Sequence, residues 1–142
     1  MRLKSLWSGF ISKTPKYTGV KGTLFTWIKK LESYSQPPKG IIALNFGLFE
    51  SDKGFMIYLT GSKVYDPTNG DWATEINYEP ISLYKYLLLP SDDIIGLKWG
   101  EVLELICLTL KDFVEEHKDY RLFKNRIVTA GFDDGDLVII KS

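Results

Sequence analysis

The fold of this chain is decided by the stretch Ile41-Ile-Ala-Leu-Asn-Phe-Gly-Leu-Phe-Glu50, followed by Asp52-Lys53-Gly54 and Phe55-Met-Ile-Tyr-Leu-Thr60. Two runs of mostly apolar and aromatic residues flank a short turn-forming segment, which is typical of two strands joined by a hairpin. The glycine at position 54 supplies the positive φ angle that such tight turns need. We therefore expect a β-hairpin over residues 41–60.

A second hairpin is predicted near the carboxyl end. Residues 126–132 and 136–141 are rich in strand-forming side chains, and Asp133-Asp134-Gly135 between them is a typical turn sequence. Asp133 and Asp134 are therefore interpreted as turn residues. Residues 81–89 lie between Pro80 and Pro90 and are expected to form a strand or a short helix, with the alternation of side chains favouring the strand.

Two segments have helical periodicity. Residues 98–117 carry the longest apolar stripe of the chain, at Trp99, Val102, Leu103, Ile106, Leu110, Phe113 and Val114. Residues 24–34 form a shorter amphipathic segment, for which Thr23 is the expected N-terminal cap. A further helix start is expected at Ser91-Asp92-Asp93.

The order of these segments predicts an α+β fold. Helices and hairpins do not alternate as they do in βαβ units, so we expect an antiparallel sheet packed against the helices 98–117 and 24–34. The length of 142 residues suits one domain over 1–142. Within it, residues 1–22 are basic and contain several turn formers, and we expect them to form an N-terminal arm.

Charge is distributed unevenly along the chain. Residues 1–40 hold eight basic residues and one acid, whereas residues 41–142 hold ten basic residues and seventeen acids, for a net charge of zero. Such asymmetry either steers association with a charged partner or is neutralised across the fold. No signal peptide or membrane-spanning run is visible, so the expected location is the cytoplasm and no membrane contact is expected.

The groups that commonly perform catalysis are scarce. The chain has one cysteine, Cys107, in an apolar run, and one histidine, His117, near the end of the predicted long helix. One histidine and one cysteine cannot supply a zinc site of nitrogen and sulfur ligands. A Ser-His-Asp or Cys-His arrangement would have to use His117, whose expected position on a surface helix suits neither. No phosphate-binding glycine loop is present, and a pI near 6.6 argues against nucleic acid as the main partner. We therefore predict a protein that is not an enzyme and needs no cofactor.

The segment 65–79 combines acidic and aromatic residues in a predicted surface loop. Aromatic side chains with a polar tip often anchor interfaces, and charges around them set the choice of partner. The predicted partner-binding residues are Tyr65, Asp66, Asp71, Trp72, Glu75, Tyr78 and Glu79. The alternatives are a plain solvated loop, or a metal-binding or catalytic set of carboxylates formed by Asp66, Asp71 and Glu75.

Residues 41–89 resemble small bacterial proteins that are encoded near polymorphic toxin genes and are taken to be immunity proteins. The resemblance rests on the run Ile42 to Glu50, on Tyr58-Leu-Thr-Gly-Ser-Lys63 with Tyr65-Asp66, and on Asp71-Trp72-Ala73. It implies a protein that neutralises one toxin by direct binding.

The predicted function is therefore that of a non-catalytic protein-binding domain, in the form of an immunity protein for a basic toxin domain. Two alternatives stay open at this point. One is a carboxylate-dependent enzyme, either metal-assisted or a glycoside hydrolase. The other is a structural or regulatory adaptor, which could form a homodimer through exposed hairpin edges.

Overall fold

The structure is a computed structural model that describes residues 19–142. Most of the predicted arm, residues 1–18, therefore lies outside the described residues. The helices and strands are α1 (Gly19–Tyr34), β1 (Ala43–Ser51), β2 (Gly54–Ser62), β3 (Tyr86–Leu88), α2 (Trp99–Glu116), β4 (Ile127–Phe132) and β5 (Val138–Lys141). Two 3₁₀ helices, η2 (Gly70–Thr74) and η3 (Ser82–Tyr84), lie in the connection between β2 and β3.

The five strands form one sheet in the order β3-β2-β1-β4-β5. Both predicted hairpins are confirmed, since β1 pairs antiparallel with β2 and β4 pairs antiparallel with β5. Gly54 has a φ of 130°, as the first turn requires. The two hairpins join along β1 and β4, which run parallel from Ala43 beside Ile127 to Leu48 beside Phe132. The predicted α+β fold is confirmed, and the sheet is mostly antiparallel.

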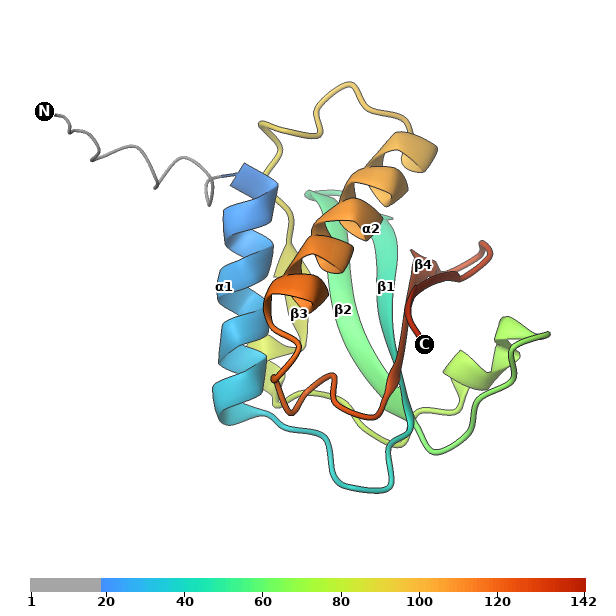
Figure 1. The fold of residues 1–142 in the computed structure, drawn as a ribbon. Helices are drawn as coiled ribbons and strands as arrows, with labels where there is room; N and C mark the ends of the chain where they lie inside the picture. Colours follow the sequence, from blue (N-terminus) through green and yellow to red (C-terminus); the bar gives the residue numbers. More distant parts are fainter. Residues whose placement is uncertain (1–18) are drawn as a thin grey trace, which may run out of the picture.

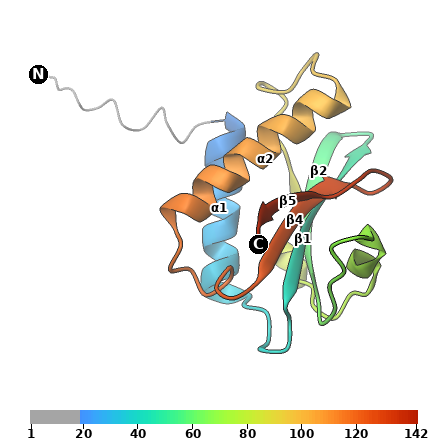
Figure 2. The same ribbon diagram turned by 45° about the vertical axis from the view of Figure 1, so that its right-hand side comes forward.

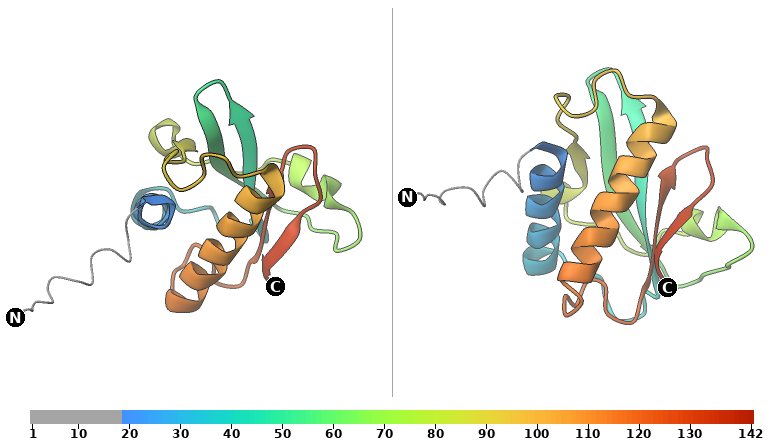
Figure 3. Two further views of the ribbon diagram at one scale, coloured as in Figure 1. Left: turned by 90° about the horizontal axis from the view of Figure 1, so that it is seen from above. Right: turned by 45° about the horizontal axis from the view of Figure 1, so that its top comes forward.

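Both long helices cover the same face of the sheet. Figure 1 shows α1 and α2 in front of the strands, and the view from above in Figure 3 shows the two helices side by side. Phe25 of α1 and Phe113 of α2 meet edge to face with ring centroids 4.6 Å apart, and Trp27 packs on Phe46 of β1. These four side chains are almost completely buried, so the core lies between the helices and this face.

Helix α1 begins five residues earlier than predicted. Its first turn is held by a carboxylate from a distant segment, because the backbone N–H of Val20 donates to Asp93 Oδ2 at 2.8 Å. Thr23 lies inside the helix, so its prediction as the cap is wrong. Residues 91–93 form a turn rather than a helix start, and Asp93 performs for α1 the capping role that the sequence assigned to Thr23.

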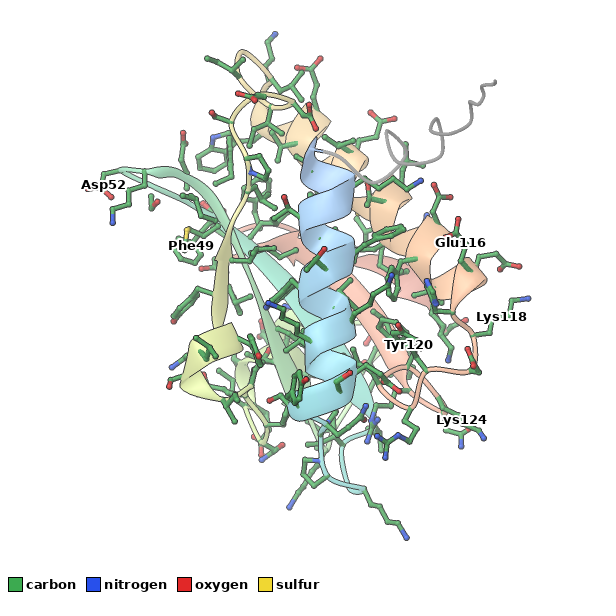
Figure 4. All side chains as sticks on the ribbon, turned by 90° about the vertical axis from the view of Figure 1, so that its left-hand side faces the viewer. Phe49, Asp52, Glu116, Lys118, Tyr120 and Lys124 are labelled. Carbon is green, nitrogen blue, oxygen red and sulfur yellow. The ribbon has the colours of Figure 1, made fainter. Side chains whose placement is uncertain are left out.

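Helix α2 closely matches its predicted range. Its core-facing residues include Val102, Ile106 and Leu110, which are completely buried. Figure 4 shows Glu116 at the end of this helix, with Lys118 just beyond it, both pointing away from the sheet. Trp99 is half exposed, stacks on Phe132 at 5.1 Å and donates through Nε1 to Glu50 Oε1. None of the helices in residues 19–142 has the length and apolar character needed to span a membrane.

Two charged side chains tie the loops at the lower end of the fold. The Glu32 carboxylate at the end of α1 accepts the backbone N–H groups of Arg121 and Leu122 at 3.0 and 2.9 Å. The Arg126 guanidinium donates to the carbonyl oxygens of Pro38 and Ile41, which precede β1. These bonds bring the segments before β1 and β4 together and so fix the start of the parallel pair.

Candidate functional site

The face of the sheet opposite the helices carries polar residues and glycines. Alternate residues of a strand point to opposite faces, so the pairing register identifies both sets. On β1 the residues that face the helices are Leu44, Phe46 and Leu48, all buried in the core. The other face, called here the open face, is formed on the three central strands by Asn45, Gly47, Phe49, Met56, Tyr58, Thr60, Thr129 and Gly131. Figure 4 shows Phe49 on the side of the sheet away from α2.

Tyr58 lies across the neighbouring strand rather than standing upright on its own. A Cβ added to Gly47, its partner on β1, would overlap the Tyr58 ring, so the glycine makes room for it. The phenol then reaches beyond β1 and donates to Asp133 Oδ1 at 2.5 Å. Burial, followed by this hydrogen bond, raises the pKa of Tyr58 well above its ordinary value. The phenol is therefore a fixed neutral donor at neutral pH.

The turn between β4 and β5 folds back over the open face. A Cβ added to Gly131 would lie 2.7 Å from the carbonyl oxygen of Asp136 and 3.0 Å from Leu137, so this approach also depends on a glycine. Leu137 in turn lies against Gly70, the first residue of η2. Figure 2 shows η2 and the β4–β5 turn close together, on the side of the sheet away from the helices.

Between these elements lies a groove of about 490 Å³, called here the acidic groove. The lining residues that matter for its chemistry are Asn45, Tyr58, Asp71, Gly131, Asp133 and Asp136. Three of them are carboxylates from two different segments. No lysine, arginine or histidine lines it within the described part of the chain. The groove therefore presents concentrated negative charge with no built-in counter-charge, which favours a cationic ligand.

A smaller hollow of about 340 Å³ adjoins the acidic groove and shares Tyr58, Ile76 and Asp133 with it. It is called here the aromatic pocket, and its characteristic lining residues are Phe49, Tyr58, Ile76, Glu79, Lys85 and Tyr86. The three aromatic rings have centroids 6.0 to 6.1 Å apart. Ile76 and Tyr86 are half exposed, so this pocket offers apolar surface directly beside the carboxylates.

Asn45 is the one strongly buried polar side chain of the acidic groove. It is 6% exposed, and its Oδ1 accepts a hydrogen bond from Thr129 Oγ1 at 2.9 Å. Its Nδ2 has no hydrogen-bond partner within residues 19–142. Because buried polar groups are nearly always paired, this open end of the amide is a position at which a ligand can bind.

A further hollow of comparable size lies elsewhere and has different chemistry. It measures about 560 Å³ and lies between α1, η3 and β3, with Trp27, Leu83 and Leu87 among its lining. Its one charged lining residue is Lys30, and no carboxylate or imidazole lines it within residues 19–142. We therefore place the candidate site in the acidic groove, where polar groups from several elements converge.

Four of the seven predicted site residues are exposed acids, and two of these contribute to the open-face site. Asp71 lines the acidic groove and Glu79 lines the aromatic pocket, where it lies 3.5 Å from Lys85. Asp66 instead accepts hydrogen bonds from the hydroxyl and N–H of Thr68, and these lower its pKa. Glu75 is exposed but lines neither hollow.

Two of the three aromatic residues of the predicted site are buried, whereas Tyr65 is half-buried. Trp72 and Tyr78, expected as exposed anchors, are only 7% and 8% exposed. Trp72 is covered because η2 folds back on β2 and its ring packs on Tyr65 at 5.3 Å. Tyr78 bridges to Gly61, and its phenol donates to the carbonyl oxygen of Ser35. Both stabilise the loop and offer little surface to a partner.

Four residues of the site were not predicted from the sequence, namely Asn45, Tyr58, Asp133 and Asp136. Asp133 was interpreted as a turn residue, and it does occupy the turn, but its carboxylate also holds Tyr58. One signal was available, since Asn45 and Gly47 alternate with the apolar residues of β1 and so define a non-apolar face. The approach of the β4–β5 turn could not be predicted from local sequence.

The remaining reactive side chains lie apart from this site. Cys107 is buried in α2, and burial raises the pKa of its thiol. His117 ends α2 and packs on the rings of Phe113 and Tyr120. Within residues 19–142 no group of three or more His, Cys, Asp or Glu side chains is placed to hold a metal ion.

Comparisons of the chain with protein-family models, with curated proteins and with solved structures find no match.

Proposed function

We propose that this chain is a cytoplasmic, non-catalytic domain that binds a protein partner through the open face of its sheet. The observation that carries the proposal is the acidic groove, in which Asp71, Asp133 and Asp136 converge without a basic neighbour among its lining residues in the described chain. The unpaired, buried Cys107 fits a reducing compartment.

The aromatic pocket supplies the second requirement of an interface. Electrostatic attraction mainly raises the association rate and selects the partner, whereas lasting affinity comes from desolvated aromatic and apolar anchors. Phe49, Tyr58 and Tyr86 lie directly beside the carboxylates and are already packed against one another. A basic surface with an apolar projection would fit both parts of the open face.

The specific form of the proposal is an immunity protein that neutralises a toxin domain with a basic surface. Its support is the sequence resemblance over residues 41–89, together with the acidic groove. A nuclease toxin is one fitting partner, because a groove that binds nucleic acid carries positive charge. Binding at such a groove would block access of nucleic acid without any chemistry by the inhibitor.

The decisive experiment compares two sets of charge-neutralising substitutions in parallel affinity captures from the native host. The first set is Asp71→Asn, Asp133→Asn and Asp136→Asn, in which the new amide at 133 can still accept from Tyr58. The control set, on α2 and just after it, is Glu104→Gln, Glu115→Gln and Asp119→Asn, all exposed in the structure.

Both variants change the net charge equally, so a nonspecific charge effect would be the same in each. We expect one partner to be captured by the unmodified chain and by the control set, and to be lost with the groove set. Salt should weaken that capture, because exposed charges at an interface are screened. Equal capture of the partner by all three baits would overturn the proposal.

A further inference from the structure

Asn45 sets a specific requirement on whatever enters the acidic groove. It faces Thr60 on β2 and Thr129 on β4, and the Thr129 hydroxyl is its one hydrogen-bond partner within residues 19–142. The oxygen and nitrogen of an asparagine amide can be exchanged without changing its shape. A hydroxyl can both donate and accept, so Thr129 is satisfied in either orientation.

One end of the amide is therefore free to adapt to a ligand. If Nδ2 donates to Thr129 Oγ1, that hydroxyl still donates to the Leu44 carbonyl oxygen, which lies 3.3 Å away. Asn45 Oδ1 is then an acceptor directed into the acidic groove. A donor from the partner would satisfy this buried group, which water reaches poorly in the free chain because Asn45 is 6% exposed.

The three carboxylates of the groove are also acceptors. Asp71 comes from η2, and Asp133 and Asp136 come from the β4–β5 turn. Tyr58 uses only the Oδ1 atom of Asp133, so Oδ2 remains available. A ligand with several donors and a positive charge matches this arrangement, and an anion does not.

A guanidinium group fits these acceptors better than an ammonium group. Its planar fork carries five N–H donors and can bond carboxylates and an amide oxygen at the same time, whereas a lysine acts as a point charge. Its flat face also stacks on aromatic rings, and Tyr58 is an aromatic residue that lines the groove.

We infer that the acidic groove binds a single arginine side chain of the protein partner, with Asn45 and the three aspartates as its acceptors. This inference rests on the proposed function and names the group that the open face recognises. The aromatic pocket beside the groove would then receive an apolar residue close to that arginine.

The test is a nuclear magnetic resonance titration of the isotope-labelled full chain with short capped peptides. The probes are acetyl-Gly-Arg-Gly-amide and its counterparts with lysine or with citrulline, which has the shape of arginine without its charge. We expect the arginine peptide to shift the Asn45 side-chain amide and the backbone amides of Gly131 and Asp133 in a saturable manner. Its affinity should exceed that of the lysine peptide by at least about fivefold, and the citrulline peptide should not bind.

Free L-arginine distinguishes a protein side chain from a small-molecule ligand. Its α-ammonium and α-carboxylate charges offset each other, so a site that recognises only the side chain should bind it no more tightly than the capped peptide. Tighter binding of the free amino acid, equal binding of the lysine peptide, or no saturable shift at these residues would each overturn the inference.

Two matched substitutions separate the role of Asn45 from its structural contact. Asn45→Leu keeps the approximate size of the side chain but removes the amide, whereas Thr129→Val removes the hydroxyl and leaves the amide in the groove. Asn45→Leu should weaken the arginine peptide at least about tenfold, and Thr129→Val should have a much smaller effect. If Asn45→Leu does not fold, the exposed Asp136→Asn serves instead, and unchanged binding in that variant contradicts the inference.

The capture experiment tests the proposed function and the peptide titration tests the arginine inference, so a negative result in one can be told from a negative result in the other. A partner that is lost with the groove set, while no peptide binds, would uphold the proposed function and overturn the arginine inference. A peptide that binds in the groove, while capture is indifferent to the groove set, would overturn the proposed function.

Discussion

The two faces of the sheet are made from alternate residues of the same strands and perform different tasks. The covered face of β1 presents Leu44, Phe46 and Leu48 to the helices, and all three are fully buried. The open face of the same strand presents Asn45 to the acidic groove and Phe49 to the aromatic pocket, with Gly47 under the Tyr58 ring between them. Large apolar residues of β1 face the helices and form the core, whereas Asn45 and Gly47 lie where other segments approach the sheet closely.

The largest expected difference between the faces is in stability. Phe46→Ala should lower the free energy of unfolding by about 3–5 kcal/mol, because it leaves a cavity beside Trp27 in the core. Phe49→Ala, on the same strand but half-buried, should lower it by only roughly 1 kcal/mol. Urea denaturation of both variants measures the contrast, and equal losses would show that the open face is also a core.

The next largest effect concerns the packing of Tyr58 over Gly47. Gly47→Ala should cost about 1–3 kcal/mol, because the new methyl group displaces the ring and breaks the bond to Asp133. In a Tyr58→Ala background the same glycine substitution should be nearly neutral, since nothing then occupies the space. A double-mutant cycle measures this coupling, and strictly additive effects would show that the ring does not need the glycine.

A smaller effect is expected at the start of α1, which helps to cover the core. Asp93→Ala should lower the free energy of unfolding by about 0.5–2 kcal/mol, because the Val20 N–H loses its acceptor. Asp92→Ala removes an exposed neighbouring carboxylate and is the matched control. Thermal unfolding distinguishes the two variants. If Thr23→Ala were the more harmful substitution, the local cap expected from the sequence would be operating after all.

The smallest expected effect is that of Tyr58 on how the free energy of unfolding changes with alkaline pH. The pKa of Tyr58 is raised in the folded chain, so above its ordinary value of 10.0 the unfolded chain loses this proton first. The folded state then binds more protons than the unfolded state, and the free energy of unfolding falls as the pH rises. Tyr58→Phe removes this contribution, although the raised pKa of Tyr78 leaves part of the decline in place.

Denaturation at a series of alkaline pH values measures the effect. Near neutral pH the free energy of unfolding of the Tyr58→Phe variant should be lower by roughly 1 kcal/mol, the contribution of one hydrogen bond. The difference in this free energy between the two proteins should narrow above pH 10.0, because only the unmodified chain loses stability through Tyr58. If this difference in the free energy of unfolding stays constant with pH, the pKa of Tyr58 is not raised in the folded chain.

Most of the fold could be predicted because its signals are local. The hairpin over 41–60 has a turn sequence between two apolar runs, and the helix over 98–117 has a long apolar stripe, so neither depends on distant contacts. The start of α1 was missed for the opposite reason. Its cap, Asp93, lies 73 residues away from Val20 in the sequence, and no local sequence pattern predicts a hydrogen bond between them.

The candidate site was predicted only in part, because some of its residues are far apart in the sequence and meet only in the folded chain. Asp71 and Glu79 were chosen because acidic and aromatic residues gather in 65–79, and both do lie at the open face. Trp72 and Tyr78 belonged to the same pattern but turned inward, since composition does not reveal which side of a loop is covered. Asp133 and Asp136 reach the groove only through the pairing of β1 with β4.

The parallel pairing of β1 with β4 also has a consequence for the timing of protein synthesis. The two strands are separated in the sequence by β2, η2, η3, β3 and α2. A ribosome must therefore finish β4 and the turn after it before Asp133 can meet Tyr58, however early the first hairpin closes. A nascent chain that ends after the first hairpin lacks Asp71, Asp133 and Asp136, so the acidic groove is complete only when the last two strands have emerged.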